Sequence, residues 1–304
     1  MRVGNMNILV SGTSGLIGSA LASFLGRRGH RVIRLVRRMP ASGASEVFWD
    51  PEGGALDPSA IEGMDAVVHL AGENIAAGRW TEARKSRILN SRSAGTRLLA
   101  RSIAILQRPP EVMISASAIG FYGDRGEQKL SEESGRGRGF LADVCSQWEQ
   151  AATAVEEMGT RLVVLRIGMV LTNAGGALQR MLPPFRWGLG GSIGGGRQYM
   201  SWIAMDDLLE TILFSLSTPA LHGAVNAVAP AAVTNLEFTR MLAKVLRKPA
   251  HIPVPAWAVR LAFGEMGAQV LLASTRVEPA RLLVAGFRFQ YPELESALRH
   301  ALEA

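Results

Sequence analysis

A glycine-rich turn carries the clearest chemical signal in this 304-residue chain. It follows the short apolar run Asn7 to Ser11 and opens a helical pattern, the context in which glycine spacing is informative. In such a turn the first glycine permits a tight bend, the second lets the backbone approach a pyrophosphate, and the third allows close helix packing. The sequence therefore predicts a dinucleotide-binding turn rather than a plain glycine-rich loop, with contacts from Gly12, Thr13, Ser14, Gly15, Leu16, Ile17 and Gly18.

Two arginines stand where an acidic residue would mark a preference for NAD. Such a residue, about 20 positions past the glycines, normally accepts hydrogen bonds from the adenosine ribose. Here the stretch reads Val36-Arg37-Arg38, with no carboxylate and two guanidinium groups. Because charge-assisted hydrogen bonds would hold a 2′-phosphate, we expect NADP(H) as the cofactor, bound by Arg37 and Arg38. The alternative is a solvated strand end.

Alternating strands and helices have to position these groups. Apolar or β-branched runs that predict strands lie at Asn7 to Ser11, His30 to Val36, Ala66 to Leu70, Val112 to Ser117 and Arg161 to Ile167. Long helical patterns separate them, as at Thr81 to Gln107 and Leu141 to Met158. The alternation predicts an α/β fold with a Rossmann-type, doubly wound parallel sheet, whose ligands bind at the carboxyl ends of the strands.

The second half of the chain changes character. Six glycines and two prolines between Leu182 and Gln198 predict a long loop, and we interpret 183–197 as a mobile lid beside the site. Helical patterns return at Asp207 to Leu216 and Leu236 to Leu246. We expect an NADP(H)-binding Rossmann core at 1–170, a substrate-side lid with the remaining core elements at 171–250, and a small C-terminal cap, the substrate-side subdomain, at 251–304.

Composition narrows the class of protein. The residues are 48% hydrophobic and 19% charged, which is enough apolar material for a core. The single cysteine, Cys145, has no partner for a disulfide or a zinc site, so we expect a cytoplasmic location and no metal. Met1 to Val10 leads directly into a strand and no long apolar run follows, so we expect neither a signal peptide nor a membrane partner. The formal charge is +7, but the basic residues form no stripe, so we expect a small anionic substrate rather than nucleic acid. A homo-oligomer is possible on the sequence alone.

Several motifs resemble the extended short-chain dehydrogenase/reductase superfamily, and more closely its epimerase-like branch that ends in a C-terminal domain of unknown function. Besides the glycine turn they are His69 to Asn74, Ser115 to Gly123, Arg166 to Gly168, Ser201 to Asp207, and Arg276 to Pro279 in the tail. One departure is Ala204, where the branch usually has a histidine. The resemblance implies that Leu70, Ala71 and Gly72 run along the adenosine and the ribose diphosphate, and that Arg166 lies nearer the nicotinamide.

The resemblance fails at the helix that should carry the catalytic pair. Enzymes of the superfamily use a tyrosine as general acid/base and a lysine four residues later, assisted by a serine and an asparagine. The pair falls here on Leu141 and Cys145, or on Phe140 and Val144, and neither choice can do that chemistry. An apolar, core-facing stripe with an unreactive Cys145 explains this helix better.

Other side chains near the expected nicotinamide are candidates for the missing acid or base. Tyr122 and Glu73 both fall in strand-end loops, although Tyr122 fits a packing role equally well and Glu73 fits a helix cap. Ser117 matches the superfamily serine, so we take Ser117 and Tyr122 as candidate catalytic residues. Arg92, at the asparagine position, counts as cofactor-binding. The sequence thus predicts an NADP(H)-dependent, epimerase-like oxidoreductase for a small substrate, nucleotide-linked compounds being one class; the alternative is a non-catalytic module that binds and senses NADP(H).

Overall fold

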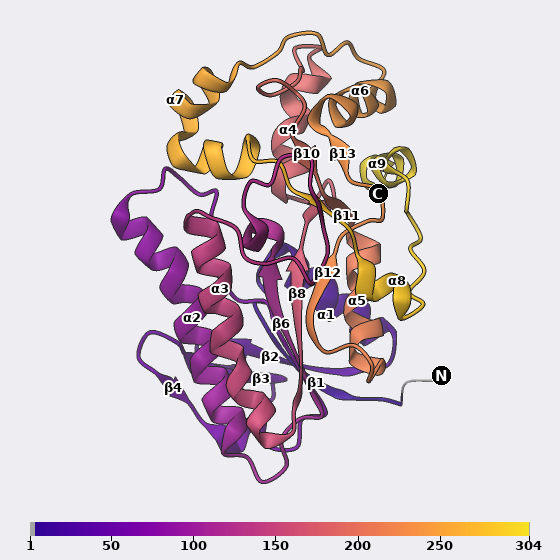
Figure 1. Cartoon of the computed structure of the whole chain (residues 1–304). Coiled ribbons are helices and arrows are strands. Elements are labelled where there is room, and N and C mark those ends of the chain that lie inside the picture. The colour runs from indigo at the N-terminus through magenta and orange to yellow at the C-terminus, as the bar shows by residue number, and fades with distance from the viewer. Residues whose placement is uncertain (1–3, 304) are drawn as a thin grey trace.

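An eight-stranded sheet forms the centre of the computed structural model, which describes residues 4–303 (Figure 1). Its strand order is β12-β8-β6-β5-β1-β2-β3-β4, and all neighbours are parallel except β3 and β4. The strands are β1 (Asn7–Ser11), β2 (Arg31–Val36), β3 (Glu46–Asp50), β4 (Ala55–Leu56), β5 (Ala66–His69), β6 (Val112–Ala118), β8 (Arg161–Ile167) and β12 (Gly223–Ala227). The order reverses between β1 and β5, which is where doubly wound sheets bind ligands.

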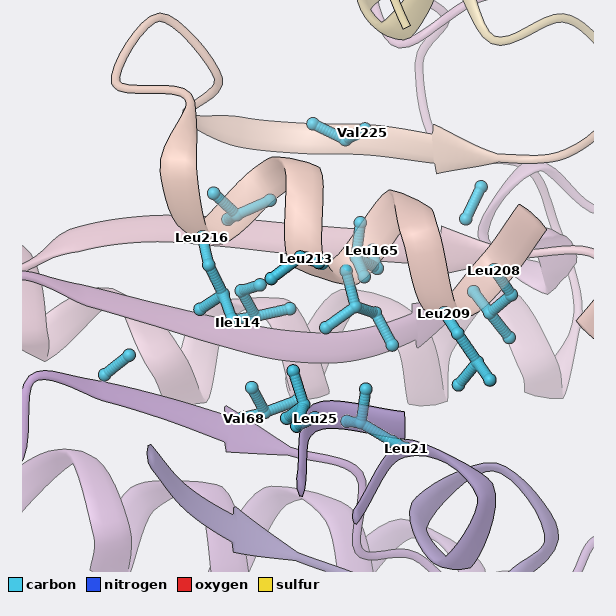
Figure 2. Close-up of a cluster of buried hydrophobic side chains, with 14 of the residues drawn as sticks. Leu21, Leu25, Val68, Ile114, Leu165, Leu208, Leu209, Leu213, Leu216 and Val225 are labelled. Atoms are coloured by element: carbon cyan, nitrogen blue, oxygen red, sulfur yellow. The ribbon is translucent and has the colours of Figure 1, made fainter. Parts of the chain in front are cut away.

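Helices cover both faces of this sheet. The first face carries α1 (Leu16–Arg27) and α5 (Met205–Ser217), whose leucines pack on alternate strand residues such as Ile114 and Leu165 (Figure 2). The second face carries α2 (Glu82–Ala104) and α3 (Phe140–Ala152), which enclose the intervening residues, among them Met113. Because successive strand side chains point to opposite faces, one buried strand supplies both cores.

A smaller third core lies beyond the carboxyl ends of the strands. Its helices are α4 (Gly176–Arg186), α6 (Asn235–Leu246) and α9 (Leu294–Glu303), and its largest buried side chains are Trp202 and Phe238. Two short strand pairs border it: β9 (Met169–Leu171) with β11 (Trp202–Ala204), and β10 (Tyr199–Met200) with β13 (Val233–Thr234). This core holds the segment after β8 above the edge of the sheet where the site is expected.

The C-terminal segment packs on several parts of the molecule. It contains α7 (Ala256–Met266), the π-helix η4 (Gly267–Leu271), β14 (Arg276–Val277) and α8 (Ala280–Val284), and β14 pairs with β7 (Lys129–Leu130). Glu132 strengthens this junction, because its Oε1 accepts hydrogen bonds from the backbone N–H groups of Asn226 and Arg281. Three 3-10 helices complete the elements: η1 (Pro58–Ile61), η2 (Ile119–Tyr122) and η3 (Thr153–Met158). The division at 170 and 250 stays an interpretation, and residues 1–3 and 304 of its outer parts lie outside the described residues.

The predicted fold class is confirmed, with one clear correction and some omissions. The loop expected over Leu182 to Gln198 is wrong in its first part, because residues 183–186 belong to α4. Leu178, Leu182 and Phe185 recur at helical spacing and are buried, so packing outweighs the two prolines. Strands β3 and β12 were not predicted, and the helix expected to Met158 changes to 3-10 geometry after Ala152.

Candidate functional site

The glycine turn between β1 and α1 has the geometry of a phosphate cradle. Gly12 has φ +73°, and a Cβ there would lie 2.8 Å from the carbonyl carbon of Leu70. A Cβ at Gly18 would lie 2.2 Å from the oxygen of Gly12, so only glycine lets α1 sit this close to the turn. The N–H of Gly15 donates to the oxygen of Gly12 at 2.9 Å and closes the bend. All three glycines therefore occupy the positions that the fingerprint requires.

The N-terminus of α1 fits an anionic group. Gly15 is its N-cap residue, no side chain caps it, and its first turn contains no acidic residue. The N–H groups there point out of the helix with the positive end of the helix dipole behind them. Gly175, from the segment after β9, lies against Leu16, since a Cβ on Gly175 would be 3.1 Å from a methyl carbon of that side chain. The turn thus suits a pyrophosphate, and Thr13, Ser14 and Ile17 belong to the same segment.

A buried serine–histidine pair holds the neighbouring strand end. The Ser11 Oγ lies 2.7 Å from Nδ1 of His69 and accepts hydrogen bonds from the backbone N–H groups of Leu70 and Ala71. Because those two donors use the lone pairs of the hydroxyl, its proton goes to Nδ1, and the neutral imidazole carries its own proton on Nε2. Burial lowers the pKa of His69 from 6.5 to about 4, in keeping with a neutral ring. The pair therefore positions Leu70, Ala71 and Gly72, the segment expected along the adenosine.

This histidine predicts a pH dependence of stability. In the unfolded chain His69 gains a proton below about pH 6.5, whereas the folded protein resists protonation until about pH 4. The contribution of His69 to the free energy of unfolding is therefore fully present above pH 6.5. It is lost as the pH decreases from 6.5 to 4, by up to about 3 kcal/mol. We expect the urea concentration at the midpoint of unfolding to change less with pH, between pH 7.5 and 4.5, in His69→Asn than in the wild type. Asparagine keeps an acceptor for the Ser11 hydroxyl. His222→Asn, at an exposed position, is the control that should follow the wild type.

The two arginines expected to read the ribose lie at the carboxyl end of β2. Both Arg37 and Arg38 are exposed, and Nη2 of Arg38 forms an ion pair with Oε1 of Glu46 on β3 at 2.8 Å. In the parallel sheet this strand end lies beside the glycine turn, because β2 pairs with β1 along its length. The structure thus brings two guanidinium groups to the edge where the adenosine ribose is expected, one of them already oriented by a carboxylate.

Arg92 lies on the other side of the strand-end turn. Its guanidinium stacks over the ring of Trp148 at 5.0 Å, and its Nη1 donates to the carbonyl of Ile88. A Cβ at Gly72 would lie 3.2 Å from Cζ of Arg92, so glycine is what lets the cation approach the turn. Burial lowers the pKa of Arg92, an effect that Cys145 and Glu73 oppose. The structure therefore brings Arg92 to the backbone of the predicted cofactor segment.

Ser117 and Tyr122 belong to one buried polar network. The Ser117 hydroxyl donates to Oε1 of Glu149 at 2.7 Å, and Glu149 in turn receives two hydrogen bonds from Arg166, at 2.9 and 2.8 Å. Arg166 also donates to the Tyr122 hydroxyl at 3.0 Å, which donates to Oδ1 of Asn226 at 2.7 Å. The ring of Phe121 lies 3.5 Å below the same guanidinium, whose side chain is only 6% exposed. The network joins the ends of β6, β8 and β12 through α3.

Tyr122 is enclosed within this network. It is fully buried, both of its hydrogen bonds are made inside the protein, and burial raises its pKa against the opposing effect of Arg166. A tyrosine that exchanges protons with a substrate needs the opposite, a lowered pKa and an open approach. Glu73 is more open, 39% exposed, and lies 3.8 Å from Arg84. The sequence motifs do not point to Glu149 or Asn226, because the contacts of these residues with Ser117, Arg166 and Tyr122 arise only when α3 and β12 pack against β6 and β8.

Helix α3 is a core helix, as its sequence pattern indicates. Val144, Cys145 and Trp148 are buried, and the ring of Phe140 makes a T-shaped contact with that of Trp80. Burial raises the pKa of Cys145 to about 11, so the thiol is protonated at neutral pH and is a poor nucleophile. The N–H of Leu141, one of the two candidate positions for the superfamily tyrosine, donates to Oε1 of Gln269 from the C-terminal segment. Helix α3 contains neither tyrosine nor lysine.

Comparison with known proteins decides the family. The model of the NAD dependent epimerase/dehydratase family matches residues 8–228, and that of a domain of unknown function, DUF1731, matches 254–301. The chain belongs to the NAD dependent epimerase/dehydratase family. The resemblance drawn from the motifs is therefore confirmed, and binding of a nicotinamide dinucleotide follows from the family and the cradle together.

Individual relatives extend this family match to almost the full length. An epimerase family protein of Mycobacterium tuberculosis, MT2273, is 42% identical over 297 residues, 98% of each chain. The crystal structure of human epimerase family protein SDR39U1 (isoform 2) with NADPH has a TM-score of 0.89 and 36% identity, covering 98% of this chain and 99% of that one. A nucleoside-diphosphate sugar epimerase from Corynebacterium glutamicum has a TM-score of 0.80 and 36% identity, covering 98% of this chain and 58% of that one.

Residues 4–303 hold neither a metal-binding cluster nor a helix that could cross a membrane. No three His, Cys, Asp or Glu side chains gather there in an arrangement that could hold a metal ion. None of the helices described combines the length and the apolar character needed to cross a membrane.

Proposed function

We propose that this member of the epimerase/dehydratase family binds NADP(H) and acts as an epimerase-type oxidoreductase on a small anionic substrate, with nucleotide-linked compounds as the class to test first. The observation that carries the cofactor choice is the carboxyl end of β2, where Val36 stands in place of an acidic residue and two exposed arginines, one of them paired with Glu46, follow beside the uncapped cradle. The human relative, whose structure holds NADPH, supports the same choice. The Corynebacterium relative, called a nucleoside-diphosphate sugar epimerase, supports the substrate class.

The chain supplies binding and orientation, while a bound nicotinamide supplies the hydride chemistry. The glycine turn and α1 hold the pyrophosphate, Arg37 and Arg38 hold the 2′-phosphate, and residues 70–72 with Arg92 border the adenosine side. Ser117, at the end of β6, is the hydroxyl that we assign to the reacting side. In the structure this hydroxyl donates its proton to Oε1 of Glu149. Arg166 and Tyr122 keep Glu149 in place, which is how we expect Tyr122 to influence turnover.

The cofactor choice predicts a specific loss of affinity. Arg37→Ala with Arg38→Ala removes two charge-assisted hydrogen bonds, so NADPH binding should weaken by at least about 2 kcal/mol, roughly 30-fold. NADH binding should change little, because it lacks the 2′-phosphate. Fluorescence titration of both cofactors on wild type and variant measures this. Equal affinity of the wild type for NADH and NADPH, or an unchanged NADPH affinity in the variant, would show that these arginines do not read the cofactor.

Turnover, when a substrate is found, should depend on the polar network and not on the thiol. Ser117→Ala removes the hydroxyl and should reduce kcat at least about 100-fold, the usual contribution of positioned proton transfer. Tyr122→Phe should give a smaller loss, because it loosens Arg166 without removing Ser117. Cys145→Ala should keep its kcat if folded, since the thiol is buried and protonated. Steady-state kinetics on a panel of nucleotide sugars and small carbonyl compounds decides this, and full activity in Ser117→Ala would remove the serine from the mechanism.

A non-catalytic module that binds NADP(H) and senses its state is the second candidate. It is favoured by the residues at the positions of the superfamily tyrosine and lysine, which are Leu141 and Cys145 or Phe140 and Val144, and by the internal hydrogen bonds of both candidate hydroxyls. Tight NADPH binding without turnover on any substrate of the panel would favour this module over the enzyme.

A further inference from the structure

Two segments of the chain have a combined net charge as large as that of the whole chain. Residues 176–200 and 235–264 together contain eight Lys or Arg and one acidic residue, Glu237. Their formal charge is therefore +7, equal to that of the whole chain, so all other residues sum to zero. Glu237 is itself bound in the capping box at the start of α6, where it accepts hydrogen bonds from Thr234. The excess positive charge belongs to one region rather than to the surface in general.

The two segments lie side by side at one end of the molecule, which carries α4, α6 and α7 (Figure 1). The N–H of Ile252 donates to the oxygen of Gly190, and that of Val254 donates to the oxygen of Ser192. A Cβ at Gly188 would lie 3.2 Å from Cγ of Pro249, so the chain after α4 runs directly against the chain after α6. These contacts also fix most of the segment interpreted as a mobile lid to the C-terminal half of the molecule.

The same end exposes large apolar side chains. Eight of the fourteen that are exposed in residues 4–303 come from these two segments: Trp187, Leu189, Leu236, Ile252, Val254, Trp257, Leu261 and Phe263. Trp187 is 78% exposed, and Trp257 and Leu261, which lie one turn apart on α7, are 67% and 69% exposed. Such a cluster is unusual on a protein surface without a partner. We call these side chains and the cations around them the apolar–basic face.

Beside the apolar side chains lies a hollow of about 750 Å³ with a cationic lining. Arg240, Lys244, Arg247, Lys248 and His251 line it, and no acidic residue does. Among the described residues, Lys244 is the one Lys or Arg of this lining with an ion-pair partner, Glu295. The hollow therefore suits anionic head groups, and exposed apolar side chains adjoin it.

We propose that the apolar–basic face docks the protein on an anionic phospholipid surface. Tryptophan and leucine side chains insert at the level of the head groups, and Lys and Arg bind the acidic lipids around them. A second copy fits less well, since two faces of +7 repel one another. A partner helix would need an apolar groove, whereas five of the side chains that line this hollow are Arg, Lys or His. This docking adds a peripheral membrane partner that the sequence did not lead us to expect, and it does not depend on the proposed chemistry.

Sedimentation with lipid vesicles tests the docking on the full chain. We expect binding to phosphatidylcholine vesicles that contain about one third phosphatidylglycerol, and at least about tenfold weaker binding to pure phosphatidylcholine. Trp187→Ser with Trp257→Ser, and Arg240→Glu with Lys248→Glu, should each weaken binding to the acidic vesicles by about tenfold or more, since each cation contributes about fivefold. All four positions are exposed, so the variants should fold, which circular dichroism checks.

Matched controls separate this face from exposed residues in general. Ile105→Ser with Val284→Ser removes apolar groups that are 71% and 90% exposed elsewhere, and Arg97→Glu with Arg101→Glu reverses two exposed charges on α2. Both should bind acidic vesicles as the wild type does. Absence of lipid-dependent sedimentation, equal losses in the controls, or a dimer in analytical ultracentrifugation that the Trp187→Ser, Trp257→Ser variant abolishes would each overturn the proposal.

Discussion

Glu149→Ala should lower the free energy of unfolding by about 3–5 kcal/mol, which is the usual cost of leaving one partner of a buried ion pair without the other. Glu149 receives two hydrogen bonds from Arg166 and one from Ser117, and the Arg166 side chain is only 6% exposed. With the carboxylate gone, a guanidinium would remain in a largely dehydrated position on top of the Phe121 ring. Urea unfolding of wild type and variant measures the loss.

Two comparisons make this prediction specific. Glu133→Ala removes a carboxylate that is 79% exposed and pairs with Arg281, so it should cost less than about 1 kcal/mol. Glu149→Ala with Arg166→Leu should cost clearly less than the sum of the two single changes, because the double variant leaves no unpaired charge. A loss for Glu149→Ala as small as that for Glu133→Ala would mean that water reaches Arg166 and that the network does not anchor β8.

Gly18→Ala is expected to cost about 3 kcal/mol or more in stability and to abolish dinucleotide binding. The added methyl carbon would lie 2.2 Å from the Gly12 oxygen and 2.7 Å from its carbonyl carbon, both of them backbone atoms that cannot rotate away. Relief requires α1 to move off the turn, which takes the helix N-terminus away from the pyrophosphate. Thermal unfolding and cofactor titration record the two effects separately.

Gly26→Ala in the same helix is the matched control. A Cβ at Gly26 has nothing within 4 Å, and alanine is the better helix former, so this variant should be unchanged or more stable by about 0.5–1 kcal/mol. If Gly18→Ala and Gly26→Ala behaved alike, the close approach of α1 to the turn would not be what the third glycine provides.

The sheet was predictable where a strand is long, buried on both faces and rich in Val, Ile and Leu, as β6 and β8 are. Such runs leave a local signal that the rest of the fold does not change. Strand β12 reads Gly-Ala-Val-Asn-Ala, and its burial depends on α8 and β8, which no local pattern reveals. The prediction of a loop directly after Leu182 is wrong for a related reason. The burial of Leu178, Leu182 and Phe185 on one face of α4 stabilises the helix despite its two prolines.

In the candidate site, too, some residues were predictable from the sequence and others were not. The glycine turn was predictable because its residues are contiguous and each has a local geometric reason. Glu149 was not, because its role arises only when α3 crosses the ends of β6 and β8 and brings it to Ser117 and Arg166. The apolar–basic face was not predictable for the same reason. It is formed by two segments that are distant in sequence, and neither segment alone has a long apolar run or a basic stripe.

The pairing of β14 with β7 has a consequence for how the chain is made. Lys129 and Arg276 become neighbours although almost half of the chain separates them. During synthesis the strands that carry the dinucleotide turn emerge early and can pack, but β7 waits with an open edge until nearly all of the protein has left the ribosome. Until then Glu132 also lacks the backbone N–H of Arg281, so the region around Asn226 is completed late. A ribosome-bound chain that stops before residue 276 should hold a formed nucleotide half with a protease-sensitive segment at 123–138.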